Sequence, residues 1–271
     1  MMNNQRNFFC PTQPELILGR NDYKEFKPSS KNVALYYQFK TANHDQPSLP
    51  IIPDGCFDIL ICCNPVKPSA VFWSSTVKRS LKEQLNYYPN SVYFGIRLLP
   101  DQEVLTIKYS MKELIDKQIH LFDVLSLEPY VIESICTAET FIERVILFED
   151  YIKYCYSRKY SPRQSVIYYL IRYIYDSKGM INLSDLYRNT GYSERYIRKK
   201  FEEYVGFSPK QFSQIVRFQN SIMRLLGDKD LNDFDIVDEY GYYDQAHFIN
   251  DFKKFADLTP NQYKKCVTLR I

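Results

Sequence analysis

The chain has 271 residues, of which 45% are hydrophobic and 25% are charged, and its net charge is +3. This composition is typical of folded proteins and excludes a disordered or collagen-like chain, and no apolar run is long enough to span a membrane. The length predicts two domains, and the first residues lack the apolar core of a secretory signal, so a cytoplasmic protein is expected.

Short apolar runs predict a β-rich region in the first half of the chain. Between residues 33 and 104 these runs are rich in Val, Ile, Phe and Tyr, and turn residues such as Pro53 and Gly55 separate them. Such runs are typical of β-strands, and several of them close together favour a small barrel or sandwich. Its interior is a candidate site for a ligand.

Helical spacing follows the predicted strands. One helix is predicted at residues 110–122, where Ser110 is a candidate cap, and another at residues 138–157. The apolar side chains of the second helix recur at spacings of four and three, as in a short coiled coil. Two interpretations stay open: packing against the helix's own domain, or a homodimer seam. The residues of this seam are Phe141, Val145, Phe148 and Ile152.

A polar, charged stretch that ends at Ser161 and Pro162 is the predicted domain boundary. Residues 1–160 are expected to form an α+β domain with a small barrel or sandwich plus helices, and residues 161–271 an all-α domain. Positive charge is concentrated in the second domain, because residues 188–217 contain seven Lys or Arg against three acidic residues. This stretch is a candidate surface for an anionic partner.

An internal repeat occupies most of the second domain. Residues 206–212 recur as residues 257–263, and Gly191 with the Tyr after it recurs as Gly241 with the Tyr after it. Two units of about 50 residues, each with a helix, a Gly-aromatic turn and a second helix, indicate a duplication. Each unit therefore has the parts of a helix-turn-helix.

The second helix of each unit divides into an apolar face and a polar face. Ser193 is a candidate cap for this helix in the first unit, and the corresponding helix of the second unit begins near Asp244. A helix in the DNA major groove needs this arrangement, because Arg can pair with guanine and Gln or Asn with adenine. The repeat thus predicts sequence-specific binding to double-stranded DNA. The candidate DNA contacts are Ser193, Glu194, Arg195, Arg198, Lys199, Lys210, Tyr243, Gln245, Asn250 and Lys253.

The second unit contains a highly specific string of residues, namely Gly241-Tyr242, Asp244, His247-Phe248, Phe252-Lys253, Thr259-Pro260 and Tyr263. With this string, residues 165–267 resemble the DNA-binding domain of AraC/XylS-type transcription regulators. The resemblance implies two helix-turn-helix units joined by a long helix, here Pro209–Leu226, that places both recognition helices on one face of the DNA. It also implies that Arg217 supports the fold or contacts the DNA backbone, and it favours an activator.

The two units are expected to contribute unequally to DNA binding. This chain has Asn250 where the family often has Arg in the second recognition helix, and the acidic stretch 228–244 repels phosphate. In the first unit, Tyr187 replaces a small residue of the family and should loosen the packing. We expect the first unit to dominate the binding energy, while the second unit sets the register or contacts RNA polymerase.

Residues 53–60, residues 93–97 and Pro100 carry a second, less specific resemblance, to a domain often found ahead of this DNA-binding module. This resemblance implies an effector or oligomerisation role for residues 1–160. Three means of control stay open: a small ligand, a partner protein and thiol oxidation. The candidate effector residues are Asp54, Cys56, Asp58, Trp73, Tyr93 and Arg97.

The sequence predicts no enzyme activity, no cofactor and no metal site. Cys56, Cys62 and Cys63 lack the paired spacing of zinc ligands, and the three histidines are scattered. These cysteines are expected to be buried small hydrophobes, with a thiol sensor as the alternative. His247 is expected to fix its helix rather than to act in catalysis.

Overall fold

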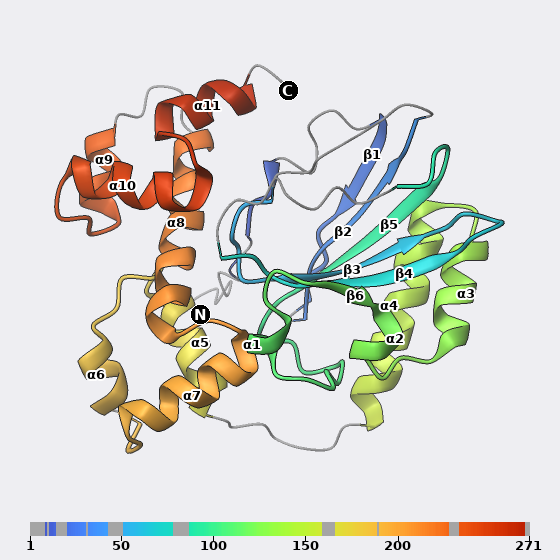
Figure 1. Ribbon diagram of the computed structural model, residues 1–271, viewed down its shortest axis with the longest axis horizontal. Helices are drawn as coiled ribbons and strands as arrows, with labels where there is room; N and C mark the ends of the chain where they lie inside the picture. Colours follow the sequence, from blue (N-terminus) through green and yellow to red (C-terminus); the bar gives the residue numbers. More distant parts are fainter. Residues whose placement is uncertain are drawn as a thin grey trace, which may run out of the picture.

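An antiparallel sheet forms the centre of the N-terminal region in the computed structural model, which describes residues 9, 11–14, 21–30, 32–42, 51–77, 87–158, 166–188, 190–227 and 233–268. Its strands are β1 (Asn21–Phe26), β2 (Val33–Lys40), β3 (Phe57–Cys62), β4 (Ser69–Trp73), β5 (Val92–Leu98) and β6 (Gln118–His120). They lie in the order β1-β2-β5-β3-β4-β6. The predicted class, an α+β region followed by an all-α region, is confirmed, and the described strands form one sheet (Figure 1).

Helices cover one face of this sheet. The helices of the N-terminal region are α1 (Met111–Leu114), α2 (Leu121–Val124), α3 (Pro129–Thr137) and α4 (Phe141–Arg158). Strand β3 is buried along its whole length, and its Ile59 joins Tyr36 of β2 and Phe94 of β5 in the core beneath α3 and α4. Strands that are buried on both faces are mostly apolar, and in β3 the exception is Asp58.

The candidate dimer seam on α4 lies inside this core. The four seam residues are at most 6% exposed and pack among the residues of the sheet: Phe141, Val145, Phe148 and Ile152. The ring of Phe148 meets Tyr36 edge to face, and Phe141 meets Phe94 in the same way. The seam interpretation is therefore corrected, because the apolar stripe of the helix covers its own sheet and is closed to a partner.

The helix predicted at residues 110–122 is interrupted. Helix α1 ends after one turn, Asp116 adopts a φ of +58°, and the chain continues as β6 and α2. The Ser110 hydroxyl makes no cap and instead donates to the Glu203 carbonyl at 3.4 Å. A tertiary contact thus outweighs the local capping pattern here.

Seven helices make up the described part of the C-terminal region. They are α5 (Val166–Asp176), α6 (Leu183–Arg188), α7 (Glu194–Val205), α8 (Pro209–Gly227), α9 (Asp233–Glu239), α10 (Gln245–Ala256) and α11 (Pro260–Thr268). Helix α8 is the predicted long helix, and in Figure 1 it runs from the group α5–α7 to the group α9–α11. We call α6 with α7 the first unit and α9 with α10 the second unit. The predicted boundary at residues 161–162 lies outside the described residues, and no helix within the described ranges is both long and apolar enough to cross a membrane.

Candidate nucleic-acid interface

Helix α7 of the first unit begins at a sharp turn followed by a serine cap. Gly191 takes a φ of +71° in the turn, and the Ser193 hydroxyl accepts a hydrogen bond from the amide of Tyr196. Ile197 and Phe201 are fully buried beneath the helix. The exposed polar side chains here are Glu194, Arg195, Arg198, Lys199, Lys200 and, at the start of α8, Lys210.

Helix α10 of the second unit repeats this arrangement. The Asp244 carboxylate accepts a hydrogen bond from the amide of His247 at 2.7 Å, as the serine does in α7. Phe248 and Phe252 are buried on the inner side of the helix. The predicted contact positions are Tyr243, Gln245, Asn250 and Lys253, of which Gln245 is half-buried and the others are exposed.

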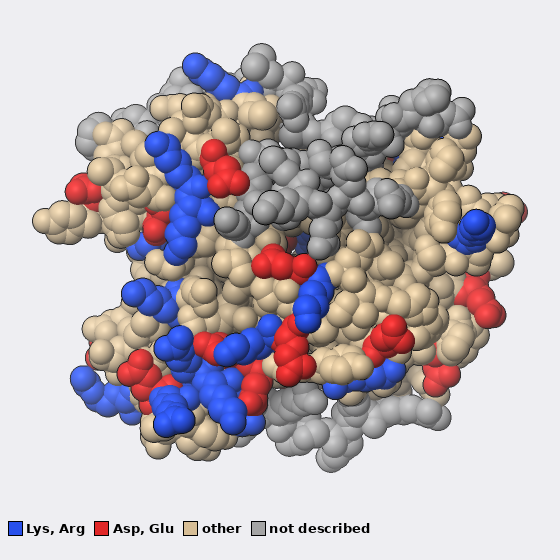
Figure 2. All heavy atoms as spheres, viewed as in Figure 1, with Lys and Arg blue, Asp and Glu red and all other residues tan. Residues whose placement is uncertain are grey.

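Basic side chains gather on the outer surface of the first unit. Figure 2 shows Lys and Arg concentrated over the part of the molecule where Figure 1 places α6 and α7. Acidic neighbours moderate this charge, since Glu202 lies 2.9 Å from Arg198 and Glu203 lies 2.8 Å from Lys200. Arg195 makes no ion pair within the described part of the chain. It is therefore the arginine of α7 whose donors are most available to a base.

Arg217 braces the second unit. Its guanidinium donates to the Asp251 carboxylate of α10 at 2.7 Å and stacks over the ring of Tyr242, 4.2 Å from the centroid. The side chain is only 14% exposed. His247 Nδ1 accepts a hydrogen bond from the amide of Tyr243, which fixes the start of α10. Of the two roles that the resemblance implies for Arg217, support of the fold is the one these contacts perform.

The C-terminal end of α7 rests on the N-terminal region. Lys112 of α1 lies 2.7 Å from Glu202, the same carboxylate that pairs with Arg198. The Tyr204 hydroxyl donates to the Gln102 carbonyl at 3.3 Å. This recognition helix is therefore held by the N-terminal region as well as by its own unit.

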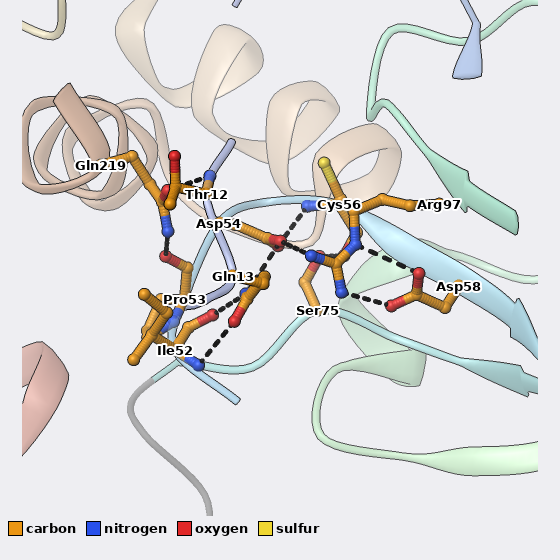
Figure 3. Close-up of polar contacts among 10 residues, drawn as sticks. All are labelled: Thr12, Gln13, Ile52, Pro53, Asp54, Cys56, Asp58, Ser75, Arg97 and Gln219. Atoms are coloured by element: carbon orange, nitrogen blue, oxygen red, sulfur yellow. Dashed lines mark hydrogen bonds and ion pairs between the residues drawn. The ribbon is translucent and has the colours of Figure 1, made fainter. Parts of the chain in front are cut away.

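A turn of the N-terminal region packs against the middle of α8 (Figure 3). The buried Gln219 side chain donates to the Pro53 carbonyl and accepts from the Thr12 amide, both at 2.7 Å. A Cβ on Gly55 would lie 2.6 Å from the ring of Phe212, and the residue has a φ of +79°, so glycine is required here. The N-terminal region thus contacts both α7 and α8.

Three candidate effector residues meet directly behind this turn. Arg97 lies 3.0 Å from Asp54 and 2.8 Å from Asp58, and all three are at most 5% exposed. Burial raises the pKa of Asp58, and the Arg97 charge opposes the rise. The Asp54 carboxylate also accepts hydrogen bonds from the Cys56 amide and from the Gln13 side chain, each at 2.9 Å. Ion pairs and hydrogen bonds among these groups hold the turn in place.

The register of the sheet explains which effector candidates meet. Asp58 of β3 is opposite both Arg97 of β5 and Trp73 of β4. Tyr93 lies at the other end of β5, opposite Cys62, and is not part of this network. Within the described ranges, no group of three or more His, Cys, Asp or Glu could hold a metal ion.

Several residues that join the regions fall outside the predicted set, among them Lys112 and Gln219. Lys112 is an exposed lysine in a polar stretch, and nothing in its surroundings marks it in the sequence. Gln219 did carry a signal, because it follows Phe218 on the buried side of α8, where a polar residue needs partners. A buried glutamine of this kind points to a contact with another part of the chain.

Known proteins match part of the chain in sequence. Residues 186–265 match the family described as a helix-turn-helix domain. An uncharacterized HTH-type transcriptional regulator of Haemophilus influenzae is 38% identical over 69 residues, which are 26% of this chain and 23% of that protein. The transcriptional regulatory protein HptR of Staphylococcus aureus is 27% identical over 95 residues, 35% of this chain and 36% of that protein. The matches thus cover between 23% and 36% of the length of these curated relatives.

Two solved structures align with the chain, one over part of its length and one over most of it. The C-terminal domain of AraT, a response regulator from Geobacillus stearothermophilus, is 24% identical, covers 39% of this chain and 88% of its own, and has a TM-score of 0.36. A singly substituted variant of apo ToxT from Vibrio cholerae is 14% identical, covers 91% of this chain and 100% of its own, and has a TM-score of 0.43.

Proposed function

We propose that this chain, which carries an AraC-type helix-turn-helix domain at residues 186–265, is a sequence-specific DNA-binding transcription regulator. The observation that carries the proposal is the pair of capped helices α7 and α10, each buried on one side and polar on the other. Helix α8 between them has 19 residues and is therefore about 28 Å long. This length is comparable with one turn of DNA, about 34 Å, so both helices can meet the major groove on one face.

Selection of DNA from a random pool by the full chain tests this function. We expect one recurrent sequence to be enriched, and Arg195→Glu to abolish the enrichment because it places a negative charge against the DNA. Lys153→Ala, an exposed change on α4, serves as the control and should leave the enrichment intact. Equal binding to scrambled DNA at physiological salt would count against the proposal.

Within this function, the first unit is proposed to provide most of the DNA affinity. It presents Arg195 and Lys199 on α7 and Lys210 beside it, and each phosphate contact adds affinity through counterion release. The second unit exposes acidic side chains, of which Asp235 and Asp238 lie on α9. We propose that this acidic face contacts RNA polymerase, which would make the chain an activator. Asp228 and Asp230 of the same acidic stretch lie outside the described residues.

Control by a small ligand is the proposed role of the N-terminal region. A cavity of about 630 Å³ lies between β1 and β2 on one side and α8 and α11 on the other, and its lining includes Tyr23, Leu35, Leu226 and Lys264. This volume is in the usual range of ligand pockets. Because both regions line the cavity, an occupant would favour one arrangement of the two regions over others. The effector candidates predicted from the sequence are not among its lining residues.

Thermal unfolding of the full chain with a panel of metabolites tests this control. A ligand of the folded state raises the unfolding temperature. We expect at least one compound to do so for the wild type and not for Leu226→Trp, in which a larger ring fills the cavity. Compounds that stabilise both forms equally would place the ligand elsewhere, and a panel without any effect would favour control by a partner protein.

A homodimer belongs to the same proposal, because two linked DNA-binding domains gain affinity through effective concentration. The buried seam residues of α4 cannot form its interface. Light scattering of the full chain at tens of micromolar tests the dimer, and a monomer at that concentration would end this part of the proposal.

A further inference from the structure

Two half-buried cysteines lie next to each other where the end of β3 meets α3. Cys63 directly follows β3, and Cys136 lies in the last turn of α3. Cys63 Sγ lies 3.9 Å from the Ile135 carbonyl oxygen, and Cys136 Sγ lies 3.8 Å from the Cys62 carbonyl oxygen. These reciprocal contacts bring the two thiols together, on the side of the N-terminal region that Figure 1 shows opposite to α5–α11.

A buried guanidinium stands beside this pair. Arg144 of α4 is 5% exposed and donates to the carbonyl oxygens of Ile135 and Ala138, at 3.2 and 2.5 Å, and to the side chain of Gln38 at 2.9 Å. All three partners are neutral. Among the described residues Arg144 forms no ion pair, and the one carboxylate next to it along the helix, Glu143, is exposed and interacts with its charge only from a distance. A buried cation without an ion pair favours an anion next to it. A thiol is the neighbouring group that can become one.

The surroundings of the two thiols differ in the direction in which they move the pKa. A hydrogen bond from Cys136 and the charge of Arg144 lower the pKa of Cys63 against the effect of burial. The hydrogen bond to Cys63 and burial raise the pKa of Cys136. The pair therefore combines a thiol whose pKa lies below its ordinary value with a thiol whose pKa lies above it, and the thiolate is the reactive form of cysteine.

We propose that Cys63 and Cys136 form a dithiol site that peroxides oxidise to a disulfide. The Cys63 thiolate attacks one oxygen of hydrogen peroxide, the O–O bond breaks, and Cys63 sulfenic acid and hydroxide form. The Cys136 sulfur then attacks the sulfur of Cys63. The S–O bond breaks, the Cys136 proton and the departing hydroxide give water, and a disulfide remains. Both cysteines together lose two electrons, which reduce the peroxide.

Each of the other cysteines in the described ranges lacks either an accessible sulfur or a neighbouring guanidinium. Cys56 and Cys62 are at most 3% exposed, and burial raises the pKa of both. Cys155 and Cys266 are partly exposed, like the proposed pair, but no guanidinium contact to either sulfur is found in this part of the chain. Because their exposure is similar, Cys155 and Cys266 serve as controls for the effect of accessibility on thiol reactivity. The proposed site does not depend on DNA binding by the C-terminal region.

Peptide mapping of the full chain after limiting hydrogen peroxide tests the proposal. We expect a Cys63–Cys136 disulfide in the wild type and in Cys266→Ser. In Cys136→Ser, dimedone should instead trap a sulfenic acid at Cys63. A disulfide between Cys62 and Cys63, dimedone labelling at another cysteine, or no oxidation of Cys63 at peroxide concentrations that oxidise Cys266 would overturn the proposal.

The rate of alkylation by iodoacetamide tests whether Arg144 lowers the pKa of Cys63. At neutral pH we expect Cys63 of the wild type to react about tenfold faster than Cys266, with a pH profile shifted to lower pH. Arg144→Met should shift the pH profile of Cys63 alkylation to higher pH and leave the profile of Cys266 unchanged. If this variant does not fold, the wild-type profiles decide, and a Cys63 profile at or above that of Cys266 would contradict the proposal.

Discussion

The two helix-turn-helix units repeat one sequence pattern but are held by different neighbours. Helix α7 rests on the N-terminal region through Lys112 and Glu202, whereas α10 is braced by α8 through Arg217 and Asp251. Both helices begin with a side-chain cap and bury the same kind of face. The repeat therefore determines how each helix is built, and the rest of the chain determines what each helix is attached to. A change in the N-terminal region can reach the first unit directly.

The ends of the two helices show the same difference. Gly206 ends α7 with a φ of +94°, and a Cβ there would lie 2.6 Å from the side chain of Ile115. The corresponding residue at the end of α10 is Asp257, which adopts a φ of +55°. Glycine is thus required where the helix end meets the N-terminal region, and a larger residue is accommodated where it does not.

The largest effect is expected for the buried charges on the N-terminal side of the contact. Arg97→Met leaves Asp54 and Asp58 buried without their cation and should lower the free energy of unfolding by about 3–5 kcal/mol. Fluorescence of Trp73, the single tryptophan, during urea unfolding reports this loss, because Trp73 lies opposite Asp58 in the sheet. A loss below about 1 kcal/mol would show that the network does not support the turn against α8.

The brace of the second unit should have the next largest effect. Arg217→Met removes a charge-assisted hydrogen bond between α8 and α10, which should cost about 1.5–3 kcal/mol. Hydrogen exchange of the α10 amides should increase, while the amides of α7 keep their protection. Equal loss of protection in both helices would contradict the separate attachment of the two units.

Substitutions at the C-terminal ends of α7 and α10 should have the third largest effect on stability. Gly206→Asp forces a side chain into the left-handed region against Ile115 and should cost about 1–3 kcal/mol in unfolding free energy. The reverse change, Asp257→Gly, relieves backbone strain and is expected to be close to neutral. If both changes cost the same, the end of α7 is no more confined than the end of α10.

The ion pair between α1 and α7 should have the smallest effect on stability. Lys112 is 62% exposed in its side chain, so Lys112→Ala is expected to cost less than about 1 kcal/mol. Lys153→Ala, which removes the exposed Lys153–Asp150 pair within α4, is the control. A cost above about 2 kcal/mol for Lys112 alone would mean that this pair carries more of the contact than a surface pair can.

Local pattern was sufficient to predict the recognition helices. Ser193 and Asp244 cap the helices they were expected to begin, and the apolar spacing of α7 gave its buried face correctly. These features depend on residues three or four positions apart, which the sequence displays directly.

The sequence did not predict which distant residues pair in the sheet or which surface covers the apolar face of α4. Asp58 and Arg97 are 39 positions apart and meet only because β3 pairs with β5 in one register. The stripe of α4 that includes Phe148 would look the same whether it covered its own sheet or a second subunit. Asp116, with its positive φ, ended a helix that the spacing of 110–122 had favoured.

The DNA affinity of two variants, one in each unit, shows whether the first unit supplies most of the binding free energy. Arg195→Ala and Lys253→Ala are compared in the full chain against the selected DNA site at two salt concentrations. We expect Arg195→Ala to weaken binding by about 5- to 150-fold, the usual range for a base contact, and Lys253→Ala to have a smaller effect. A Lys253→Ala loss as large as that of Arg195→Ala would contradict this expectation.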